Sequence, residues 1–281
     1  MIIIGERLNS SRRPVLEALR DRNEEYVLKE ARRQEKAGAS YLDVNTAALL
    51  GKEVETLAWV IPLLQRELCL PLSLDTPNLK AMEEGLRLHK GRALLNSLTG
   101  EAERLKRVLP LIKEHKPQII ALCLDDEGLP ASSAKELAAA QRLVDLLEKE
   151  GVNPEDIFVD PLVRPVGVDQ NAVNLFLESL EKIKKSMPSV RTVAGISNVS
   201  FGLPQRSLLN STLLVLALKE GLDAAILDPL DREIMAALAS SGALLGHDPG
   251  LRDYLALVRK SRVQAAKRVP LQTDSPGETQ G

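Results

Sequence analysis

The chain has 281 residues, which is long enough for one large domain or for two small ones. Apolar residues make up 44% of the chain and charged residues 27%, as in an ordinary soluble globular protein. Aromatic residues make up only 2%, which argues against a base-stacking surface for nucleic acid, and the net charge of −2 argues against a general binder of phosphate backbones.

Short apolar segments typical of buried strands alternate with helical segments along the chain. In chain order, the predicted strands are 2–4, 41–46, 71–75, 92–97, 118–124, 156–161, 192–196 and 221–229. The helices that follow them are predicted at 23–37, 52–68, 78–88, 101–114, 133–149, 169–186, 207–218 and 232–245. Eight such units, at spacings of roughly 20 to 40 residues, predict an α/β fold, a (β/α)₈ TIM barrel. A doubly wound sheet is the alternative, but its G-x-G-x-x-G phosphate fingerprint is missing, as is a Walker A sequence.

We predict one domain, over residues 1–270. Its last segment, 253–266, is amphipathic and is expected to pack across the outside of the barrel or on a partner. Residues 271–281 are expected to form a disordered tail, because this end of the chain is rich in Ser, Pro and Gly.

Neither the N-terminus nor the cysteines indicate export. The first residues lack the pattern of a signal peptide, and no apolar run approaches the roughly 18 residues of a membrane span. Cys69 and Cys123 each lie in an apolar run, so we expect two buried thiols, and their spacing supports neither a disulfide bond nor a metal site. The sequence therefore predicts a cytoplasmic protein in a reducing compartment.

Polar side chains stand at or just beyond the ends of the predicted strands, where they would converge on one mouth of a barrel. They are Glu6, Asn9, Asp43, Asn45, Asp75, Asn96, Asp125, Asp160, Ser197, Asn198 and Asp228. An Asp at such a place is often only the N-cap of the next helix, and for Asp125 and Asp228 this interpretation stays open. A ligand-binding role is favoured for Asp75 and Asp160, because each ends an apolar strand and is followed within two residues by proline.

The predicted mouth contains no histidine, because His89, His115 and His247 lie in helical or loop segments and are expected on the surface. Neither a zinc site nor a Ser/His/Asp triad is therefore supported, and a hard cation would need more clustered carboxylates. Carboxylates and amides instead suit a neutral heterocycle, such as a 2-amino-4-oxo-pyrimidine ring with its adjacent N–H donors. The predicted ligand is a polar heterocycle, with no metal.

Seven motifs resemble those of the pterin-binding methyltransferases, and they run in that family's order over most of the chain. They are Ile-Gly-Glu-Arg-Leu-Asn at 4–9, Leu-Asp-Val-Asn at 42–45, Leu-Asp-Thr-Pro-Asn at 74–78, Leu-Asn-Ser at 95–97, Val-Asp-Pro-Leu at 159–162, Gly-Ile-Ser-Asn-Val-Ser at 195–200 and Leu-Asp-Ala-Ala-Ile at 222–226. The block at 195–200 is the most specific of them. The sequence is most similar to the methyltetrahydrofolate:corrinoid protein methyltransferases and to the folate domain of cobalamin-dependent methionine synthase.

The resemblance implies a barrel of the dihydropteroate-synthase-like type and transfer of the N5 methyl group of methyltetrahydrofolate to, or from, a Co(I) corrinoid. That corrinoid (a cobalamin) would be carried by a separate corrinoid protein. Asp75, Asn96 and Asp160 would hydrogen-bond the pterin ring, and Asn198 would assist at N5 as the C–N bond breaks. The further residues implied to line the substrate site are Ser197, Asp43, Asn45, Glu6 and Asn9, and those implied to face the corrinoid are Arg206 and Phe201. A homodimer is also implied, and the proton for N5 is expected through water near Asp43 or Asp75.

Two other functions stay open. One is a non-catalytic module that docks a pterin or a corrinoid protein. The other is a dihydropteroate-synthase-like enzyme, which is disfavoured because that family has a basic residue where this chain has Asn198. Phe201 stands where the acetogenic methyltransferases are expected to have glutamine. The partner implied by the resemblance therefore stays open between a corrinoid iron–sulfur protein and a catabolic corrinoid protein.

Overall fold

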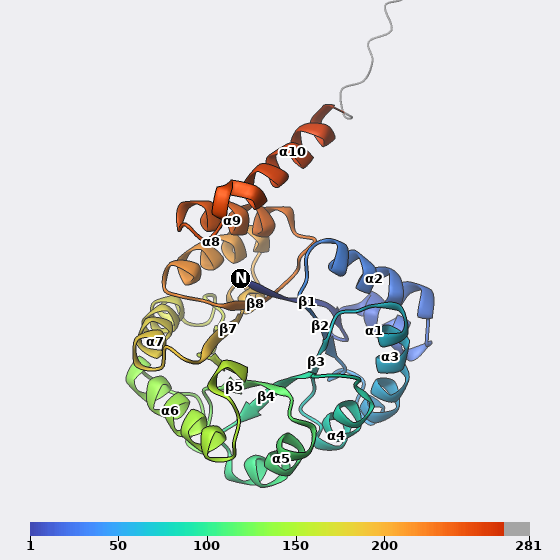
Figure 1. Ribbon diagram of the computed structural model, residues 1–281, viewed down its shortest axis with the longest axis vertical. Helices are drawn as coiled ribbons and strands as arrows, with labels where there is room; N and C mark the ends of the chain where they lie inside the picture. The colour runs from blue at the N-terminus through green and yellow to red at the C-terminus, as the bar shows by residue number, and fades with distance from the viewer. Residues whose placement is uncertain (267–281) are drawn as a thin grey trace, which may run out of the picture.

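Eight parallel strands close into a barrel in which each strand pairs with the next and β8 pairs with β1 (Figure 1). The computed structural model describes residues 1–266, with side chains described for residues 1–259. The strands are β1 (Ile2–Asn9), β2 (Tyr41–Asn45), β3 (Leu72–Asp75), β4 (Leu94–Thr99), β5 (Gln118–Leu122), β6 (Ile157–Asp160), β7 (Arg191–Gly195) and β8 (Ala224–Leu227). The predicted TIM barrel is thereby confirmed.

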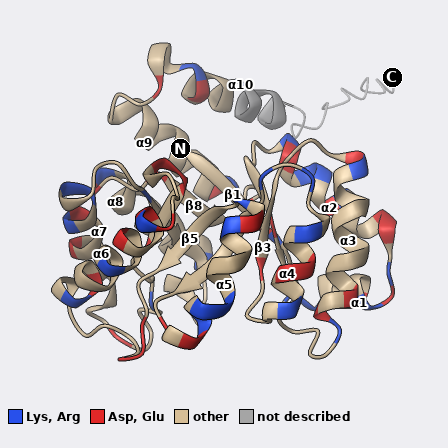
Figure 2. Ribbon diagram, turned by 60° about the horizontal axis from the view of Figure 1, so that its bottom comes forward, with Lys and Arg blue, Asp and Glu red and all other residues tan. Residues whose placement is uncertain are grey.

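The helices surround the barrel, and Figure 2 shows that residues of both charges are distributed along them. They are α1 (Arg13–Arg20), α2 (Glu24–Lys36), α3 (Glu53–Glu67), α4 (Leu79–Leu88), α5 (Ala102–His115), α6 (Ser133–Lys149), α7 (Ala172–Ser186), α8 (Arg206–Lys219), α9 (Arg232–Leu244) and α10 (Arg252–Ala266). Three 3₁₀ turns complete the described elements: η1 (Pro154–Asp156), η2 (Ile196–Ser200) and η3 (Pro249–Leu251). The sequence prediction missed α1, a two-turn helix that has Pro14 in its first turn and buries Val15, Ala18 and Leu19.

The barrel interior changes from apolar to polar along the strands. Its amino-terminal part is filled by Ile4, Leu94, Ile120, Phe158, Val193 and Ala224, all of them buried. Side chains on one face of a strand recur every two residues, so the next inward positions are Glu6 on β1, Asn96 on β4 and Asp160 on β6. A packed apolar layer therefore supports a polar layer at the ends of the strands.

The last helix leaves the barrel. Helix α10 contacts α9 and projects away from the barrel wall, so it does not pack across the outside of the barrel (Figure 1). The predicted tail at 271–281 lies outside the described residues. Within the part of the chain that the structure describes, no helix is both long enough and apolar enough to cross a membrane.

Two predictions about single side chains were wrong. Cys69 is exposed, because it follows the end of α3 in the turn before β3, whereas Cys123 is buried as predicted. His89 is partly buried at the end of α4, where its Nε2 accepts a hydrogen bond from the Leu72 backbone N–H at 3.1 Å. Burial lowers the pKa of His89, so this histidine acts as a neutral acceptor for the first N–H of β3.

Candidate functional site

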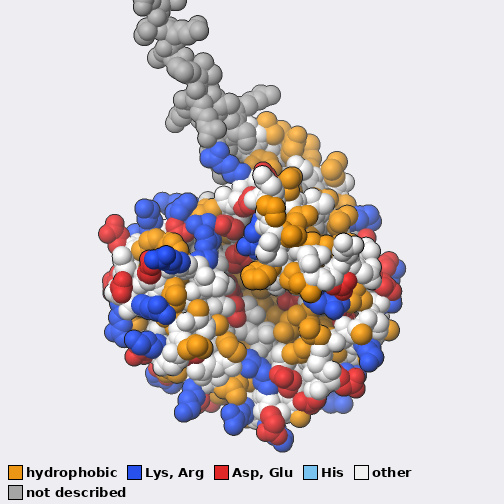
Figure 3. All heavy atoms as spheres, turned by 180° about the vertical axis from the view of Figure 1, so that it is seen from behind, with side chains coloured by type: hydrophobic (Ala, Val, Ile, Leu, Met, Phe, Trp, Pro, Cys, Tyr) orange, Lys and Arg blue, Asp and Glu red, His pale blue; other side chains and the backbone are white. Residues whose placement is uncertain are grey.

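The polar side chains at the ends of β2, β3 and β4 form one hydrogen-bonded cluster. Strand register places Asn45 beside Asp75, and Asp75 beside Asn96. Asn45 Nδ2 donates to Asp75 Oδ2 at 2.5 Å, and Asn96 Nδ2 donates to Asp43 Oδ1 at 3.1 Å. Asp43 Oδ1 also accepts from Ser73 Oγ at 2.6 Å. Figure 3 shows the molecule from behind, with a hollow at its centre and acidic and hydrophobic side chains around that hollow.

Asp43 and Asp75 are neighbouring carboxyl groups whose pKa values are both raised. Burial raises the pKa of both carboxyl groups, and the negative charge of Asp75 raises the pKa of Asp43 further. A hydrogen bond between the two carboxyl groups lowers the pKa of Asp75 in turn. These causes favour a proton on Asp43 over one on Asp75.

Asp160 lies at the end of β6, across the mouth from this cluster, and is 9% exposed. Its Oδ1 accepts a hydrogen bond from the Leu162 backbone N–H at 2.9 Å. No other donor among the described residues bonds to this carboxyl group, so one oxygen is free for a ligand. Burial raises the pKa of Asp160 to about 7.

Asn198 lies in η2, directly after β7, and its side chain is exposed. Among the described residues its amide has no hydrogen-bond partner, which leaves one amide donor and acceptor pair available at the mouth. The amide lies close over Gly195, because a Cβ atom added to Gly195 would stand 2.9 Å from Asn198 Nδ2. Glycine at position 195 therefore gives the Asn198 amide its space.

The residue before Asn198 is held from two sides. Ser197 Oγ donates to Glu6 Oε1 at 2.5 Å, and the Ser197 carbonyl accepts from Arg206 Nη2 at 2.7 Å. Arg206 also donates through Nε to Ser200 Oγ at 3.0 Å. Burial raises the pKa of Glu6 to about 7 despite the hydrogen bond from Ser197.

Two other residues at the strand ends, Asn9 and Asp228, have partners away from the central cluster. Asn9 Oδ1 accepts from the Ser11 backbone N–H at 2.9 Å. Asp228 pairs with Arg7, whose Nη1 lies 2.5 Å from Asp228 Oδ2, and it does not cap α9, whose N-cap is Asp231.

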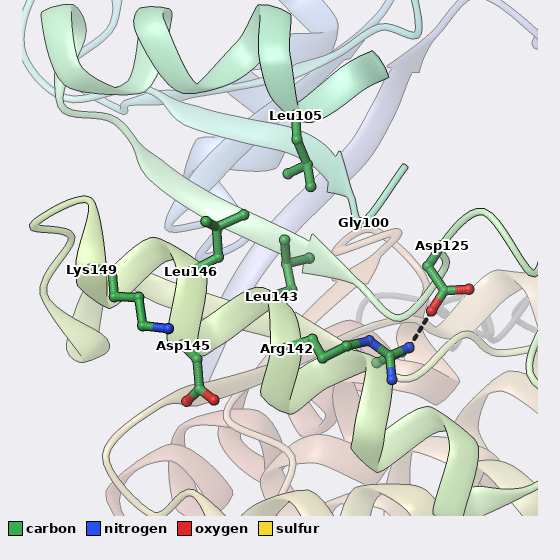
Figure 4. A pocket seen from close by; sticks show the side chains of 9 residues that line it. Gly100, Leu105, Asp125, Arg142, Leu143, Asp145, Leu146 and Lys149 are labelled. Atoms are coloured by element: carbon green, nitrogen blue, oxygen red, sulfur yellow. Dashed lines mark hydrogen bonds and ion pairs between the residues drawn. The ribbon is translucent and has the colours of Figure 1, made fainter. Parts of the chain in front are cut away.

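Asp125 forms an ion pair with Arg142 on α6 and does not cap that helix, whose N-cap is Ser132. This pair lies at a groove of about 400 Å³ outside the barrel, between α5 and α6, which Figure 4 shows from close by. The groove is lined by Gly100, Leu105, Asp125, Arg142, Leu143 and Leu146 among others. None of the residues predicted to bind the pterin or the corrinoid lines it, so the groove is separate from the mouth.

Sequence reasoning missed side chains that orient the cluster without ending a predicted strand. Ser73 lies within β3 and donates to Asp43, and Ser10 Oγ donates to Asn45 Oδ1 at 3.2 Å. Ser73 could have been found from the sequence, because it is a polar residue two positions before Asp75 in the strand Leu-Ser-Leu-Asp at 72–75 and therefore lies on the same face as Asp75. Within the described residues, no group of three or more His, Cys, Asp or Glu side chains is arranged to hold a metal ion.

A buried glutamate, Glu136 on α6, lies within electrostatic reach of Asp160 and Cys123. It is 1% exposed, and within the described part of the chain its Oε2 has no hydrogen-bond partner. Burial raises the pKa of Glu136 from 4.5 to about 7. At a pH between 4.5 and about 7, Glu136 is protonated in the folded protein but ionised in the unfolded chain. The free energy of unfolding therefore falls as the pH rises through this range.

We therefore expect Glu136→Gln to stabilise the protein more at about pH 8 than at about pH 5, with a difference of up to about 1.4 kcal/mol per pH unit of the window. The measurement is the free energy of unfolding from urea titrations at both pH values. Glu148→Gln, at an exposed position of the same helix, is the matched control. An equal effect of Glu136→Gln at the two pH values would contradict the assignment.

Comparison with known proteins agrees with this geometry. The model of the family described as pterin binding enzyme matches residues 5–228. The methylcorrinoid:tetrahydrofolate methyltransferase of Eubacterium limosum is 31% identical over 265 residues, which are 94% of this chain and 98% of that protein. The methionine synthase of Mycobacterium tuberculosis is 29% identical over 239 residues, 80% of this chain but only 20% of that protein.

Solved structures of dihydropteroate synthases share the fold. That of Yersinia pestis with a pterine–sulfa conjugate has a TM-score of 0.67 at 17% identity, covering 88% of this chain and 93% of that one. That of Coxiella burnetii in complex with pteroic acid has a TM-score of 0.62 at 18% identity, covering 86% and 93%. At these identities the likeness to solved structures shows the fold alone. The family match over residues 5–228 and the relative that is 31% identical over 94% of this chain show the family, and this chain belongs to the pterin-binding enzymes.

Proposed function

We propose that this protein is a methyltransferase that moves the N5 methyl group of methyltetrahydrofolate to the Co(I) corrinoid of a corrinoid protein or, in the reverse direction, moves the methyl group of the methylated corrinoid to N5 of tetrahydrofolate. The observation that carries the proposal is the grouping, at one barrel mouth, of a hydrogen-bonded Asp/Asn cluster, a buried Asp160 and the unpartnered amide of Asn198. The name of the Eubacterium limosum relative, a methylcorrinoid:tetrahydrofolate methyltransferase, supports it.

The pterin ring is bound by Asp75, Asn96 and Asp160 in this proposal. Asn45 orients the Asp75 carboxylate, and protonated Asp43 supports the charge on Asp75. Asn96 donates its amide N–H to Asp43, which leaves its carbonyl oxygen free to accept an N–H of the ring. The free oxygen of Asp160 accepts a second ring N–H. Asn9 lies at the edge of the same site.

The chemistry at N5 follows from the electron balance of the transfer. The Co(I) electron pair forms the bond to the methyl carbon, and the electron pair of the broken C–N bond stays on N5, which gains a proton. The Asn198 amide donates a hydrogen bond to N5 that strengthens as negative charge develops there. The proton held by the Asp43–Asp75 pair is the nearby buried source, and it reaches N5 through water.

The partner approaches over the mouth. Phe201 is 70% exposed just after η2, and the exposed Arg206 begins α8, so both side chains face the incoming corrinoid in the proposal. We propose that the protein acts as a homodimer with one mouth per subunit. Dihydropteroate synthase activity is not favoured, since Asn198 is neutral and cannot supply the positive charge expected there.

The proposal is tested with the purified protein, methyltetrahydrofolate and free cob(I)alamin in a stopped-flow spectrometer. We expect the Co(I) absorbance to decay with formation of methylcobalamin at a rate that saturates with methyltetrahydrofolate. Binding of methyltetrahydrofolate without any transfer would instead support the docking module. Failure to bind methyltetrahydrofolate would contradict both.

A further inference from the structure

We propose that Glu6 is a positioning residue, which acts through Ser197 to hold the η2 turn so that the Asn198 amide reaches N5. This inference rests on the proposed function, and it gives Glu6 and Ser197 a role different from contact with the pterin. The observation behind it is a contact between β1 and η2, 191 positions apart in the chain, in which Ser197 Oγ donates to Glu6 Oε1 at 2.5 Å.

The η2 turn is anchored on both sides of Asn198. Glu6 holds Ser197 from β1, and Arg206 holds the Ser197 carbonyl and Ser200 Oγ from the start of α8. Ser200 Oγ in turn donates to Asn210 Oδ1 at 2.7 Å, deeper in the same helix. Asn198 is the polar side chain of this turn that these contacts leave without a partner, so the contacts fix its backbone without using its amide.

Glu6 is suited to positioning by its surroundings. Its side chain is partly buried, and the hydrogen bond from Ser197 is the only one that its carboxyl group makes within the described residues. The charged groups that face it are Asp228, Arg206, Arg12 and Asp43. Because a carboxyl group in such a place needs a donor, the Ser197 hydroxyl is held in one orientation. A misplacement of a reacting group by about 1 Å can lower a rate by about 100-fold, so a loosened η2 turn is expected to slow transfer.

Four variants test the inference: Glu6→Leu, Ser197→Ala, the double variant, and Glu6→Gln, which keeps an acceptor oxygen for Ser197. The probes are methyltetrahydrofolate and free cob(I)alamin. We expect Glu6→Leu and Ser197→Ala each to lower the single-turnover transfer rate by about tenfold or more, with the Kd for methyltetrahydrofolate within about twofold of the wild type. The double variant should be no slower than Glu6→Leu alone, and Glu6→Gln should keep most of the rate.

A structural readout keeps the test independent of catalysis. The side-chain amide signals of Asn198 in a nitrogen-15 NMR spectrum, assigned by their loss in Asn198→Ala, should shift or broaden in Glu6→Leu and Ser197→Ala but not in Glu6→Gln. Glu17→Leu, at an exposed glutamate of α1, is the matched control and should leave them unchanged.

Three results would overturn the inference. The first is unchanged Asn198 signals in Glu6→Leu, and the second is a double variant whose loss of transfer rate equals the product of the two single losses. The third is a Glu6→Gln variant in which the affinity for methyltetrahydrofolate falls by as large a factor as the transfer rate. The last of these would mean that Glu6 contacts the pterin itself. If Glu6→Leu does not fold, Ser197→Ala and Glu6→Gln decide the question. If the variants show the expected NMR changes but the wild-type protein transfers no methyl group, the proposed function is contradicted. The role of Glu6 in positioning Asn198 would remain supported.

Discussion

Asn198→Ala is expected to slow methyl transfer by about 100-fold or more while the Kd for methyltetrahydrofolate changes little. In the structure the Asn198 side chain is exposed and its amide makes no hydrogen bond with another described residue, so its removal leaves no buried group unpaired and the fold should be unaffected. The hydrogen bond to N5 gains strength only as the C–N bond breaks, and losing a donor of this kind costs about 3 kcal/mol in the transition state. The measurement is a single-turnover rate at saturating methyltetrahydrofolate, together with a binding titration.

Gly195→Ala is a companion variant that leaves Asn198 in place. Gly195 has an ordinary φ of −78°, so alanine fits the backbone there, but its Cβ would lie 2.9 Å from Asn198 Nδ2. The amide must therefore turn away, and we expect a loss of rate in the same direction, with methyltetrahydrofolate binding and thermal stability near those of the wild type. Equal losses of rate and of binding in Asn198→Ala would contradict the assigned role at N5.

The barrel could be predicted because the sequence alternates regularly between strand-like and helix-like segments and because polar residues follow the strands. Short apolar strands and longer helical segments alternate eight times, and the strand ends carry Asp or Asn at positions such as 43, 75, 96 and 160. The same alternation gives the depth of each side chain. Phe158 is in the apolar layer and Asp160, two residues later, is in the polar layer.

The partners of each polar side chain could not be predicted, because they come from distant elements. Strand β1 was expected to end at residue 4, yet it continues to Asn9, which pairs with Asn45 of β2. Within this extension Arg7 is bonded to Glu30 of α2 and to Asp228 after β8. A charged Glu-Arg pair resembles a loop in sequence and becomes part of a strand only when those acceptors are in place. The hydrogen bond from Ser197 to Glu6 is of the same kind.

Acidity at the mouth could not be predicted either. Asp43, Asp75 and Asp160 each follow an apolar residue of a predicted strand, so the sequence does not distinguish them. In the structure burial raises the pKa of all three, and only Asp43 and Asp75 interact with each other. The proposed division of labour depends on this difference. A carboxylate that must accept ring N–H groups has to be ionised, whereas a proton source has to stay protonated near neutral pH.

Asp160 gives the second large expected effect, a pH-dependent affinity for the pterin. Its pKa is about 7 in the ligand-free protein, because the carboxyl group is buried and accepts a single backbone hydrogen bond. The ionised form accepts the ring N–H much more strongly than the neutral acid does, so binding is accompanied by loss of a proton when the pH is below 7. We expect the Kd for methyltetrahydrofolate to be constant above about pH 8 and to weaken by up to tenfold for each pH unit below about 7.

Asp160→Asn tests whether this group is the one that titrates. The variant keeps the size of the side chain but replaces a charged acceptor with an amide, which is expected to weaken binding by about 10- to 100-fold at about pH 8. Its Kd should also lose the dependence on pH, because asparagine does not ionise. Isothermal titration calorimetry in two buffers of different ionisation enthalpy measures the affinity and the proton release together. Glu6 has a pKa of about 7 as well, so a pH dependence that persists in Asp160→Asn and disappears in Glu6→Gln would assign the titration to Glu6 and contradict the role given to Asp160.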